Sequence, residues 1–203
     1  MIAILTNADR DTHHHVFDQM FRGRAVVFHE MYDQDVSISD GREVDRYDMA
    51  GDPVYLVLTD NSGDVAGSLR LLPTVGDTIL QNEFRDHFDA PVDFRSPTAW
   101  ECTKFCIHPR NSTSDIKLRR AVAYELLIKL CALALKSGIE HIISVHETRM
   151  IEIYRCIGWE PDQLARAHGN LDGLAVGLWE VSETHLREMR NRASADLFQG
   201  LVT

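Results

Sequence analysis

Charged side chains concentrated in the first half of the chain are the residues best suited to chemistry. The stretch GREVDRYD, residues 41–48, carries Glu43, Asp45 and Asp48 close together. Upstream of it, Arg24 falls on the apolar stripe of a helix pattern. A lone buried cation costs on the order of several kcal/mol. We therefore expect Arg24 to bind the acids of this stretch.

A second arginine lies inside a strand pattern. In VAGSLRLLP, residues 65–73, period-two alternation places Val65 and Gly67 on one face and Arg70 on the other. Arg70 is therefore a second embedded cation that needs a carboxylate. For each such charge alone, a structural ion pair is the commoner explanation.

The pattern AWECTKFCI, residues 99–107, adds a fourth acid and a lysine. Alternation groups Glu101, Thr103 and Phe105 on one face and leaves Lys104 opposite, so Glu101 and Lys104 share a site only if a β-bulge intervenes. Taken together, two arginines, one lysine and four acids predict a polar cleft that binds a zwitterionic ligand.

The elements that must position these residues alternate irregularly between strand and helix. Strand patterns cover residues 2–6, 53–60, 65–73, 98–109, 139–146 and 173–181. Helix patterns cover residues 11–32, 116–138, 147–159 and 182–193, and residues 33–52 are expected to form an extended loop. Because the order lacks strict βαβ alternation, it predicts an α+β sandwich around one mixed sheet. With 203 residues, we expect a single domain, 1–203.

Composition excludes several classes of partner. A formal net charge of −10 disfavours nucleic acids and anionic membranes. The chain has no run of 18 apolar residues, and its first residues lack the basic start of a signal peptide, so we expect a cytoplasmic protein without membrane insertion.

Cysteines and histidines give no metal signal. Cys102, Cys106, Cys131 and Cys156 lie in apolar surroundings without a Cys-x-x-Cys pair, which predicts reduced core thiols, with a catalytic cysteine as the weaker alternative. Three consecutive histidines, 13–15, would fan out around a helix and cannot easily converge on one ion. We expect no metal.

Several motifs resemble the acyl-homoserine-lactone synthases, the LuxI-type autoinducer synthases of bacterial quorum sensing. The matching pieces are RAVVF, EVDRYD, GSLRLLPT, ILQNEF and WECTKF, which occur in the family's order within residues 20–107. Two positions depart from the family pattern. Gln34 stands where the family usually has tryptophan, and Lys104 stands where it has arginine, which keeps the charge but not the bidentate fork.

The resemblance implies both a fold and a reaction. The fold is expected to be a single-domain α/β/α sandwich with a mixed, split central sheet, similar to the GNAT-type N-acyltransferases. The implied substrates are S-adenosylmethionine and an acyl thioester, with no cofactor. The α-amine attacks the thioester carbonyl, and the methionyl carboxylate then closes the lactone and expels methylthioadenosine.

The resemblance also implies roles for individual residues. Glu101 is the expected proton acceptor for the amine, directly or through water. Asp45 and Asp48 are expected to hold the cationic substrate and to clamp Arg24 and Arg70, which orient its carboxylate. The other implied substrate-binding residues are Phe28, Glu43, Thr103, Lys104, Phe105, Ser144 and Met150. The hydroxyl of Ser144 either hydrogen-bonds a 3-substituent of the acyl chain or is satisfied by its own strand. Met150 either lines the acyl tunnel or fills the core.

The acyl donor is expected to be a carrier protein or coenzyme A. The pyrophosphate loop of the GNAT-type enzymes, Gln/Arg-x-x-Gly-x-Gly/Ala, is absent before the helix at 116–138, which favours an acyl-carrier protein. An acidic carrier would bind the basic neighbourhood formed by Arg110, Lys117, Arg119 and Arg120.

Two other functions remain open from the sequence. One is an ordinary N-acyltransferase that acylates another amine with coenzyme A, against which the missing pyrophosphate loop counts. The other is a non-catalytic carrier-protein or ligand-binding module on the same fold, against which Glu101 and the intact acidic stretch 41–48 count.

Overall fold

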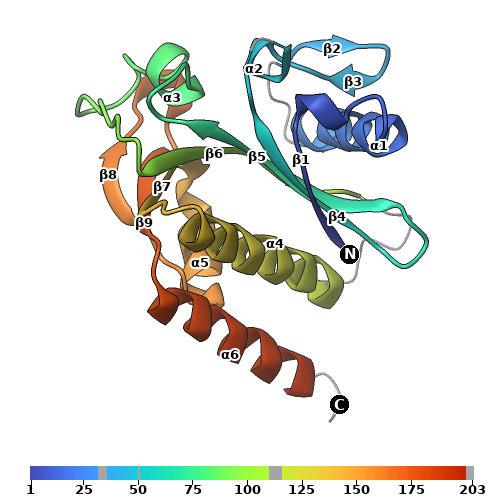
Figure 1. Ribbon diagram of the computed structural model, residues 1–203. Coiled ribbons are helices and arrows are strands. Elements are labelled where there is room, and N and C mark those ends of the chain that lie inside the picture. Colours follow the sequence, from blue (N-terminus) through green and yellow to red (C-terminus); the bar gives the residue numbers. More distant parts are fainter. Residues whose placement is uncertain (32–35, 50, 110–115, 200–203) are drawn as a thin grey trace. The chain divides into compact units, whose positions relative to one another are not determined.

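A computed structural model describes residues 1–31, 36–49, 51–109 and 116–199 (Figure 1). The chain separates into two compact units. Unit 1 comprises Met1–Leu72 and Lys104–Lys129, and unit 2 comprises Pro73–Thr103 and Leu130–Thr203. Within the described ranges, no helix is both long and apolar enough to cross a membrane. The single domain expected over 1–203 stays a prediction.

Unit 1 is built on an antiparallel sheet. Its elements are β1 (Ile2–Leu5), η1 (Asn7–Asp9), α1 (His14–Ala25), the π-helical turn η2 (Val26–Met31), β2 (Ile38–Ser39), β3 (Arg42–Glu43), α2 (Arg46–Met49), β4 (Val54–Thr59), nearly all of β5 (Val65–Pro73), the end of β6 (Ala99–Ile107) and residues 116–129 of α4 (Ile116–Lys136). Strand β4 pairs with β1 on one side and with β5 on the other. The strand and helix patterns predicted for this part of the chain are therefore confirmed.

Helix α1 and helix α4 cover opposite faces of this sheet. Phe17 of α1 packs edge-on against Tyr55 of β4, with ring centroids 5.4 Å apart. On the other face, Gly67 of β5 lies directly against Val122 of α4. A register shift between Leu58 and Thr59 turns Val65 towards Phe17, so the predicted sharing of a face by Val65 and Gly67 is wrong.

The predicted loop at 33–52 is wrong where the chain is described, because it contains β2, β3 and α2. Strands β2 and β3 form a hairpin whose turn residues, Asp40 and Gly41, both have positive φ angles, 51° and 72°. Asp-Gly is a strong signal for such a type I′ turn. The sequence thus carried the hairpin signal in a segment too polar for strand periodicity to be visible.

Unit 2 contains the other half of the sheet. Its elements are the start of β6, α3 (Ile79–Asn82), the end of α4, β7 (His141–Glu147), η3 (Thr148–Met150), α5 (Ile151–Ile157), β8 (Asp162–Arg166), η4 (Gly169–Leu171), β9 (Leu174–Glu180) and α6 (Glu183–Gln199). Strand β6 pairs in parallel with β7, β7 pairs antiparallel with β9, and β9 pairs antiparallel with β8. Together with unit 1, the chain has seven strands in a mixed sheet, as the α+β prediction requires.

The pairing of β6 with β7 is short. It runs from Ala99 opposite His141 to Glu101 opposite Ile143, whereas β7 pairs with β9 along its whole length. Among the described residues of unit 2, the β6-facing edge of β7 from Ser144 onward is therefore not part of the ladder. The end of this ladder after Glu101 is where the expected split in the sheet would lie.

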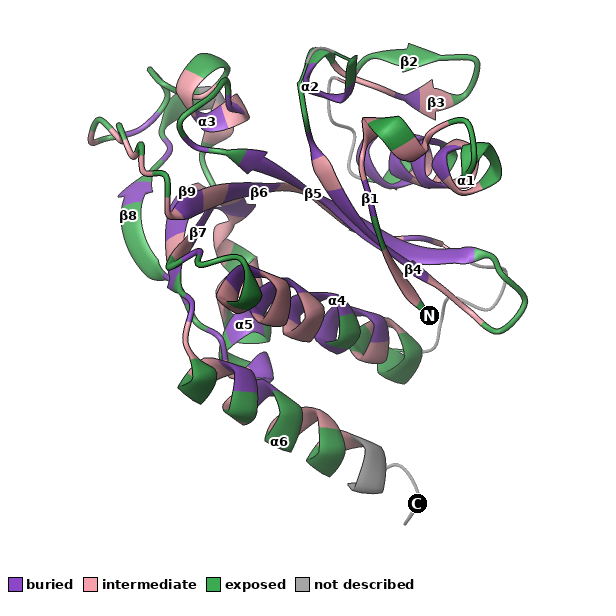
Figure 2. Cartoon of the chain, in the orientation of Figure 1, coloured by how far each residue is buried: buried purple, intermediate pink, exposed green. Residues whose placement is uncertain are grey.

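Two elements of unit 2 were missed from the sequence, and burial explains one of them. Strand β8 buries only Ala165 of its five residues, and Figure 2 shows the rest of it as mostly exposed. Without an alternating apolar face, an edge strand has no period-two signal. Helix α3 is a single turn, too short for a helical period.

The cysteine prediction holds for three of four residues. Cys102, Cys106 and Cys131 are buried and reduced, and burial raises their thiol pKa values to about 12, 12 and 11. Cys156 is exposed on α5, so its prediction as a core thiol is wrong. Because only the thiolate is a strong nucleophile, the raised pKa values argue against a catalytic role for the buried three.

Replacing Gly67 with alanine should destabilise unit 1. An added Cβ would lie 2.7 Å from Cγ1 of Val122 and 3.0 Å from the backbone oxygen of Cys106, which cannot move aside easily. We expect a loss of about 1–3 kcal/mol in the free energy of unfolding, measured by urea titration. At the control position Gly76, the nearest atom to an added Cβ is 3.6 Å away, and we expect no comparable loss. Equal effects at the two positions would contradict the packing argument.

Candidate active site

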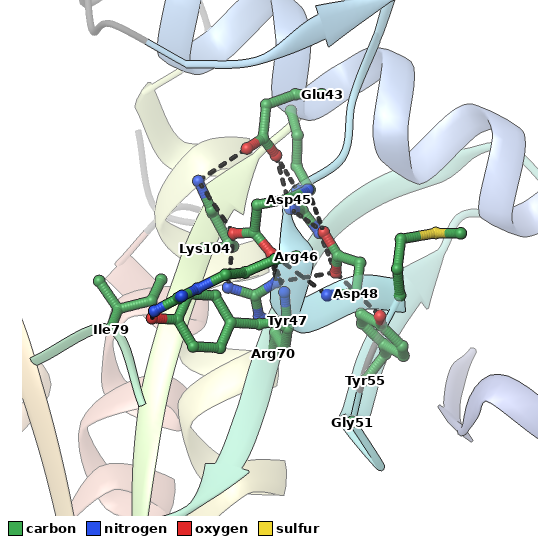
Figure 3. Close-up of polar contacts among 12 residues, drawn as sticks. Glu43, Asp45, Arg46, Tyr47, Asp48, Gly51, Tyr55, Arg70, Ile79 and Lys104 are labelled. Atoms are coloured by element: carbon green, nitrogen blue, oxygen red, sulfur yellow. Dashed lines mark hydrogen bonds and ion pairs between the residues drawn. The ribbon is translucent and has the colours of Figure 1, made fainter. Parts of the chain in front are cut away.

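Arg24 is the centre of a buried ion network in unit 1. Figure 3 labels the other members of this network, which are Glu43, Asp45, Asp48, Arg70 and Lys104. The side chain of Arg24 projects from the face of α1 that packs against the sheet, and only 1% of its surface is exposed. Its Nε donates to Oε2 of Glu43 at 2.6 Å, and its Nη1 and Nη2 donate to the two oxygens of Asp48 at 3.1 and 2.8 Å. The predicted pairing of Arg24 with the acids of residues 41–48 is confirmed.

Arg70 joins the same network from β5. Its Nη1 and Nη2 donate to the two oxygens of Asp45 at 2.5 and 2.9 Å, and Nη1 lies 2.9 Å from Oδ1 of Asp48. Lys104, from the end of β6, places its Nζ 2.8 Å from Oε1 of Glu43 and 3.8 Å from Oδ2 of Asp45. Three cations thus face three carboxylates, and the network has no net charge.

The short helix α2 fixes the two aspartates by backbone hydrogen bonds. Oδ1 of Asp45 accepts the N–H groups of Tyr47 and Asp48 at 2.9 and 3.2 Å, while Oδ2 of Asp48 accepts the N–H of Asp45 at 3.0 Å. This reciprocal arrangement is that of a capping box. The hydroxyl of Tyr55 also donates to Oδ1 of Asp48 at 2.9 Å. The carboxylates are therefore held in place independently of any ligand.

Electrostatics keeps Asp48 and Arg24 ionised inside the network. Burial opposes ionisation of Asp48, but the attraction of Arg24 and then of Arg70 outweighs it and holds the pKa of Asp48 well below its ordinary value. Burial likewise opposes the charge on Arg24, yet Asp48 and Glu43 raise the pKa of its guanidinium. Burial, followed by the charge of Asp48, raises the pKa of the Tyr55 phenol, which keeps that hydroxyl a donor.

Only two members of the network reach its outer edge. The side chains of Asp45 and Lys104 are 21% and 14% exposed, whereas that of Arg70 is fully buried. The ammonium of Lys104 also lies 5.1 Å from the centre of the Phe28 ring, within range of a cation–π contact. A ligand that approaches the network would therefore meet Asp45 and Lys104 first.

Lys104 reaches the network because the strand is irregular at this residue. Its φ angle is 53°, a left-handed conformation that a lysine in a strand rarely adopts. Such a residue breaks the alternation of side chains along β6, which is the irregularity that the sequence argument required. Strained residues of this kind collect at functional sites.

Glu101 lies in unit 2 and holds a different partner. It is 1% exposed, and its Oε2 and Oε1 accept the backbone N–H groups of Ile79 and Leu80 at 2.9 and 2.8 Å. These are the first two residues of α3, so the carboxylate fixes the start of this helical turn. The sequence did not show this contact, because a single turn preceded by Thr78 carries no periodic signal.

The remaining predicted substrate-binding residues are spread over both units. Phe28 is buried in unit 1, Phe105 is half-buried in unit 1, and Thr103 is half-buried in unit 2. In unit 2, the hydroxyl of Ser144 donates to the carbonyl of Val145 at 3.2 Å.

Met150 is half-buried at the end of η3. Nothing in its surroundings decides between tunnel and core, so both interpretations stay open. For Ser144, by contrast, the local bond of its hydroxyl favours the interpretation that its own strand satisfies it.

The predicted carrier-binding neighbourhood is partly described. Lys117 and Arg120 are exposed in the first turn of α4, and Arg119 lines a cavity of about 250 Å³ within unit 1. Arg110 lies outside the described residues, as does Gln34, the other departure from the family pattern. Among the residues that are described, no group of three histidine, cysteine, aspartate or glutamate side chains could hold a metal ion.

Solved structures define the class of the fold. An acyl-CoA N-acyltransferase from Pseudomonas aeruginosa matches with a TM-score of 0.54 and 12% identity, over 90% of this chain and 99% of that one. The acyl-homoserine-lactone synthase LasI matches with a TM-score of 0.80 and 21% identity over 94% of both chains. The CoA-dependent acyl-homoserine lactone synthase BjaI, solved with S-adenosylmethionine and isopentyl-CoA, also matches with a TM-score of 0.80. Its identity is 23%, over 96% of this chain and 89% of that one. The fold is that of the N-acyltransferases.

Sequence relatives then identify the family. The family model of the autoinducer synthases matches residues 8–179. An acyl-homoserine-lactone synthase from Rhizobium etli is 50% identical over 199 residues, which cover 98% of this chain and 93% of that one. Another from Agrobacterium fabrum is 31% identical over 163 residues, 77% and 75% of the two chains. The chain belongs to the autoinducer synthase family, and the predictions of fold class, family and acyltransferase activity are confirmed at that level.

Replacing Asp48 with asparagine should destabilise the protein strongly and change its response to acid. The neutral amide leaves the buried guanidinium groups of Arg24 and Arg70 without their shared carboxylate, for which we expect a loss of about 3–5 kcal/mol. The pKa of Asp48 is lower in the folded than in the unfolded chain. The ionised carboxylate therefore stabilises the fold fully at pH values above its pKa in the unfolded chain, about 4, and this stabilisation is lost as the pH falls below that pKa. Urea titrations between about pH 2.5 and 6 should therefore show a smaller acid-induced loss of stability in the variant.

Asp18 provides the control for this variant. It also pairs with two arginines, Arg22 and Arg42, but these pairs are partly exposed to solvent. We expect Asp18→Asn to cost about 1 kcal/mol or less. A loss as large as that of Asp48→Asn would show that burial of the network is not what matters.

Proposed function

We propose that the chain is an acyl-homoserine-lactone synthase that uses S-adenosylmethionine and an acyl thioester. The observation that supports this most directly is the buried, neutral network of Arg24, Glu43, Asp45, Asp48, Arg70 and Lys104 in a member of the autoinducer synthase family. A set of charges held in this way, with a carboxylate and an ammonium at its edge, suits a ligand that carries both a cation and a carboxylate.

The reaction has two bond-forming steps. The α-ammonium of S-adenosylmethionine first loses a proton, and its nitrogen bonds to the acyl carbonyl carbon while the carbon–sulfur bond of the thioester breaks. The departing thiolate takes up the second proton of the nitrogen. The substrate carboxylate oxygen then bonds to the γ-carbon, and the electron pair of the sulfonium carbon–sulfur bond stays on sulfur, which releases neutral methylthioadenosine. Both leaving groups are activated already, so the proposal calls for no cofactor.

Asp45 and Lys104 are the residues of the network that we propose to contact S-adenosylmethionine. Their side chains lie at its edge, and their charges are opposite, so they complement the cationic and anionic groups of the substrate. Arg24 and Arg70 are almost fully enclosed and already bonded to carboxylates, which favours a positioning role over the expected direct contact with the substrate carboxylate. Asp48, also buried, would act with them, and Phe28 would contribute to the aromatic wall.

Glu101 is proposed as the proton acceptor of the first step, directly or through water. Its carboxylate oxygens accept the backbone N–H groups of Ile79 and Leu80. The contacts to α3 would fix its orientation while it acts as the base, as a general base requires. Thr103 and Phe105 follow it on the same strand and are proposed to line the substrate path.

The acyl thioester is proposed to enter at the split between β6 and β7 in unit 2. The edge of β7 from Ser144 onward lies outside the ladder with β6, so its backbone groups are available to an extended arm. A carrier protein would bind the basic residues at the start of α4, Lys117, Arg119 and Arg120, with Arg110 as a further candidate. Coenzyme A remains the alternative donor, and the cytoplasm is the compartment we expect for either.

Incubation of the purified protein with S-adenosylmethionine and acyl thioesters tests the proposed function. We expect equal amounts of free thiol and methylthioadenosine, detected by liquid chromatography, with donors supplied on carrier protein and on coenzyme A in parallel. Thiol without methylthioadenosine would instead support an ordinary N-acyltransferase. Release of neither product by folded protein would support a non-catalytic binding module.

Replacing Glu101 with glutamine should reduce kcat by about 10²- to 10⁴-fold if the carboxylate is the base. The amide cannot accept a proton at neutral pH, so the rate of the variant should also lose the low-pH limb of the wild-type profile. Circular dichroism and the KM for both substrates distinguish loss of the base from disturbance of α3. Disturbance of α3 would raise KM or unfold the protein, whereas loss of the base would change neither. Glu140→Gln, at an exposed residue of unit 2, serves as the control and should leave the rate unchanged. Normal turnover by Glu101→Gln would remove the base assignment.

A further inference from the structure

His146 of β7 is a buried histidine with one nitrogen left without a partner. The residue is 7% exposed, and its Nδ1 lies 3.0 Å from the carbonyl oxygen of Glu147. Its Nε2 is enclosed and has no hydrogen-bond partner among the residues that the structure describes. A buried polar atom in this state costs about 1–3 kcal/mol, so it calls for an explanation.

The chemical state of this nitrogen follows from its surroundings. A carbonyl oxygen only accepts hydrogen bonds, so the hydrogen of the imidazole is on Nδ1. Burial lowers the pKa of His146, against a smaller opposite effect of the bond to Glu147, and this keeps the ring neutral. Nε2 therefore presents a lone pair, and the partner that it lacks is a donor.

Aromatic side chains enclose the His146 ring and leave little freedom to turn it. The rings of Tyr154, from α5, and Trp179, from β9, each lie 5.5 Å from it by centroid and meet it edge-on. At Gly177, also on β9, an added Cβ would lie 2.9 Å from the Trp179 indole. The indole is itself fixed by donation from its Nε1 to the carbonyl of Trp159 at 3.0 Å. The direction of the Nε2 lone pair is thus built into unit 2.

The position of His146 along β7 connects it to the split in the sheet. It belongs to the part of β7 that β6 leaves unpaired (the strands are labelled in Figure 1). Ser144, two residues earlier, shares its face by alternation, and its hydroxyl hydrogen is directed to the carbonyl of Val145. Both polar side chains on this face therefore present acceptors, and neither presents a donor.

We propose that Nε2 of His146 accepts a hydrogen bond from a hydroxyl group on the acyl chain of the substrate. The inference rests on the proposed function, which places an acyl chain in this unit. A hydroxyl supplies the donor that the site lacks, whereas a ketone brings another acceptor and an unsubstituted chain leaves Nε2 unpaired. The enzyme should therefore select hydroxylated acyl thioesters over both, because a site built to bond a polar group rejects analogues that lack it.

Competition among acyl donors of equal length tests this selectivity. With unsubstituted, 3-oxo and 3-hydroxy acyl thioesters, we expect wild-type kcat/KM, followed by methylthioadenosine release, to favour the hydroxy chain about 5- to 150-fold, the range for one buried hydrogen bond. His146→Phe keeps an aromatic ring but removes Nε2, and should abolish the preference while turnover of the unsubstituted chain changes little.

His141→Phe is the matched control for this substitution. His141 is on the same strand but contacts Phe94, with ring centroids 6.0 Å apart. It lies five positions before His146, and an odd offset along a strand puts it on the opposite face. We expect it to retain the wild-type preference. A preference that survives in His146→Phe, or one that is absent from the wild type because water satisfies Nε2, would overturn the proposal. Absence of methylthioadenosine with every donor would instead refute the proposed function.

A spectroscopic measurement on the wild type keeps the proposal testable if His146→Phe fails to fold. In protein labelled with ¹⁵N-histidine, the resonance of an unprotonated imidazole nitrogen should move upfield when a 3-hydroxyacyl homoserine lactone is added. The unsubstituted lactone of equal length should leave it in place. The same shift with both lactones, or with neither at saturation, would contradict a bond to the hydroxyl.

Discussion

The guanidinium of Arg24 is the constraint on which the surrounding structure depends. Once helix α1 packs its apolar stripe on the sheet, this charge is enclosed, and only carboxylates delivered by other segments can compensate it. Glu43 and Asp48 do so from β3 and α2. The hairpin and the helical turn are therefore tied to α1 by charge pairing, in addition to the apolar packing of Val44 and Tyr47.

Neutrality of the network explains why Lys104 adopts an unfavourable backbone conformation. Without its ammonium, the two arginines would face three carboxylates, and one negative charge would be left in a largely enclosed site. The left-handed φ of Lys104 brings the third cation to Glu43 at a cost of order 1–3 kcal/mol, which is comparable to the benefit of pairing a buried carboxylate. The lysine lies 2.8 Å from Oε1 of Glu43 and 3.8 Å from Oδ2 of Asp45, without the bidentate geometry that an arginine fork would give.

The sequence predicted what periodicity and charge balance can show. The major strands and helices have long apolar patterns, and the pairing of Arg24 and Arg70 with the acids followed from the cost of burying a charge alone. Among the elements missed, β8 is exposed and α3 is one turn long, so neither leaves a pattern. The partners of Glu101 could not be predicted because they are backbone N–H groups, which every residue except proline carries. Similarly, the orphan Nε2 of His146 depends on ring orientation, which no spacing encodes.

Charge also bears on how such a chain could bind an acidic carrier. The overall charge of −10 repels an acidic protein at long range, but salt screens it beyond about 8–10 Å. At contact, the local charges decide. Lys117, Arg119 and Arg120 occupy the first turn of α4, where the helix dipole disfavours cations by about 0.3–1 kcal/mol each and acids are absent. Since the helix dipole does not favour these cations, their presence at the α4 start agrees with the proposal that an acidic carrier binds there.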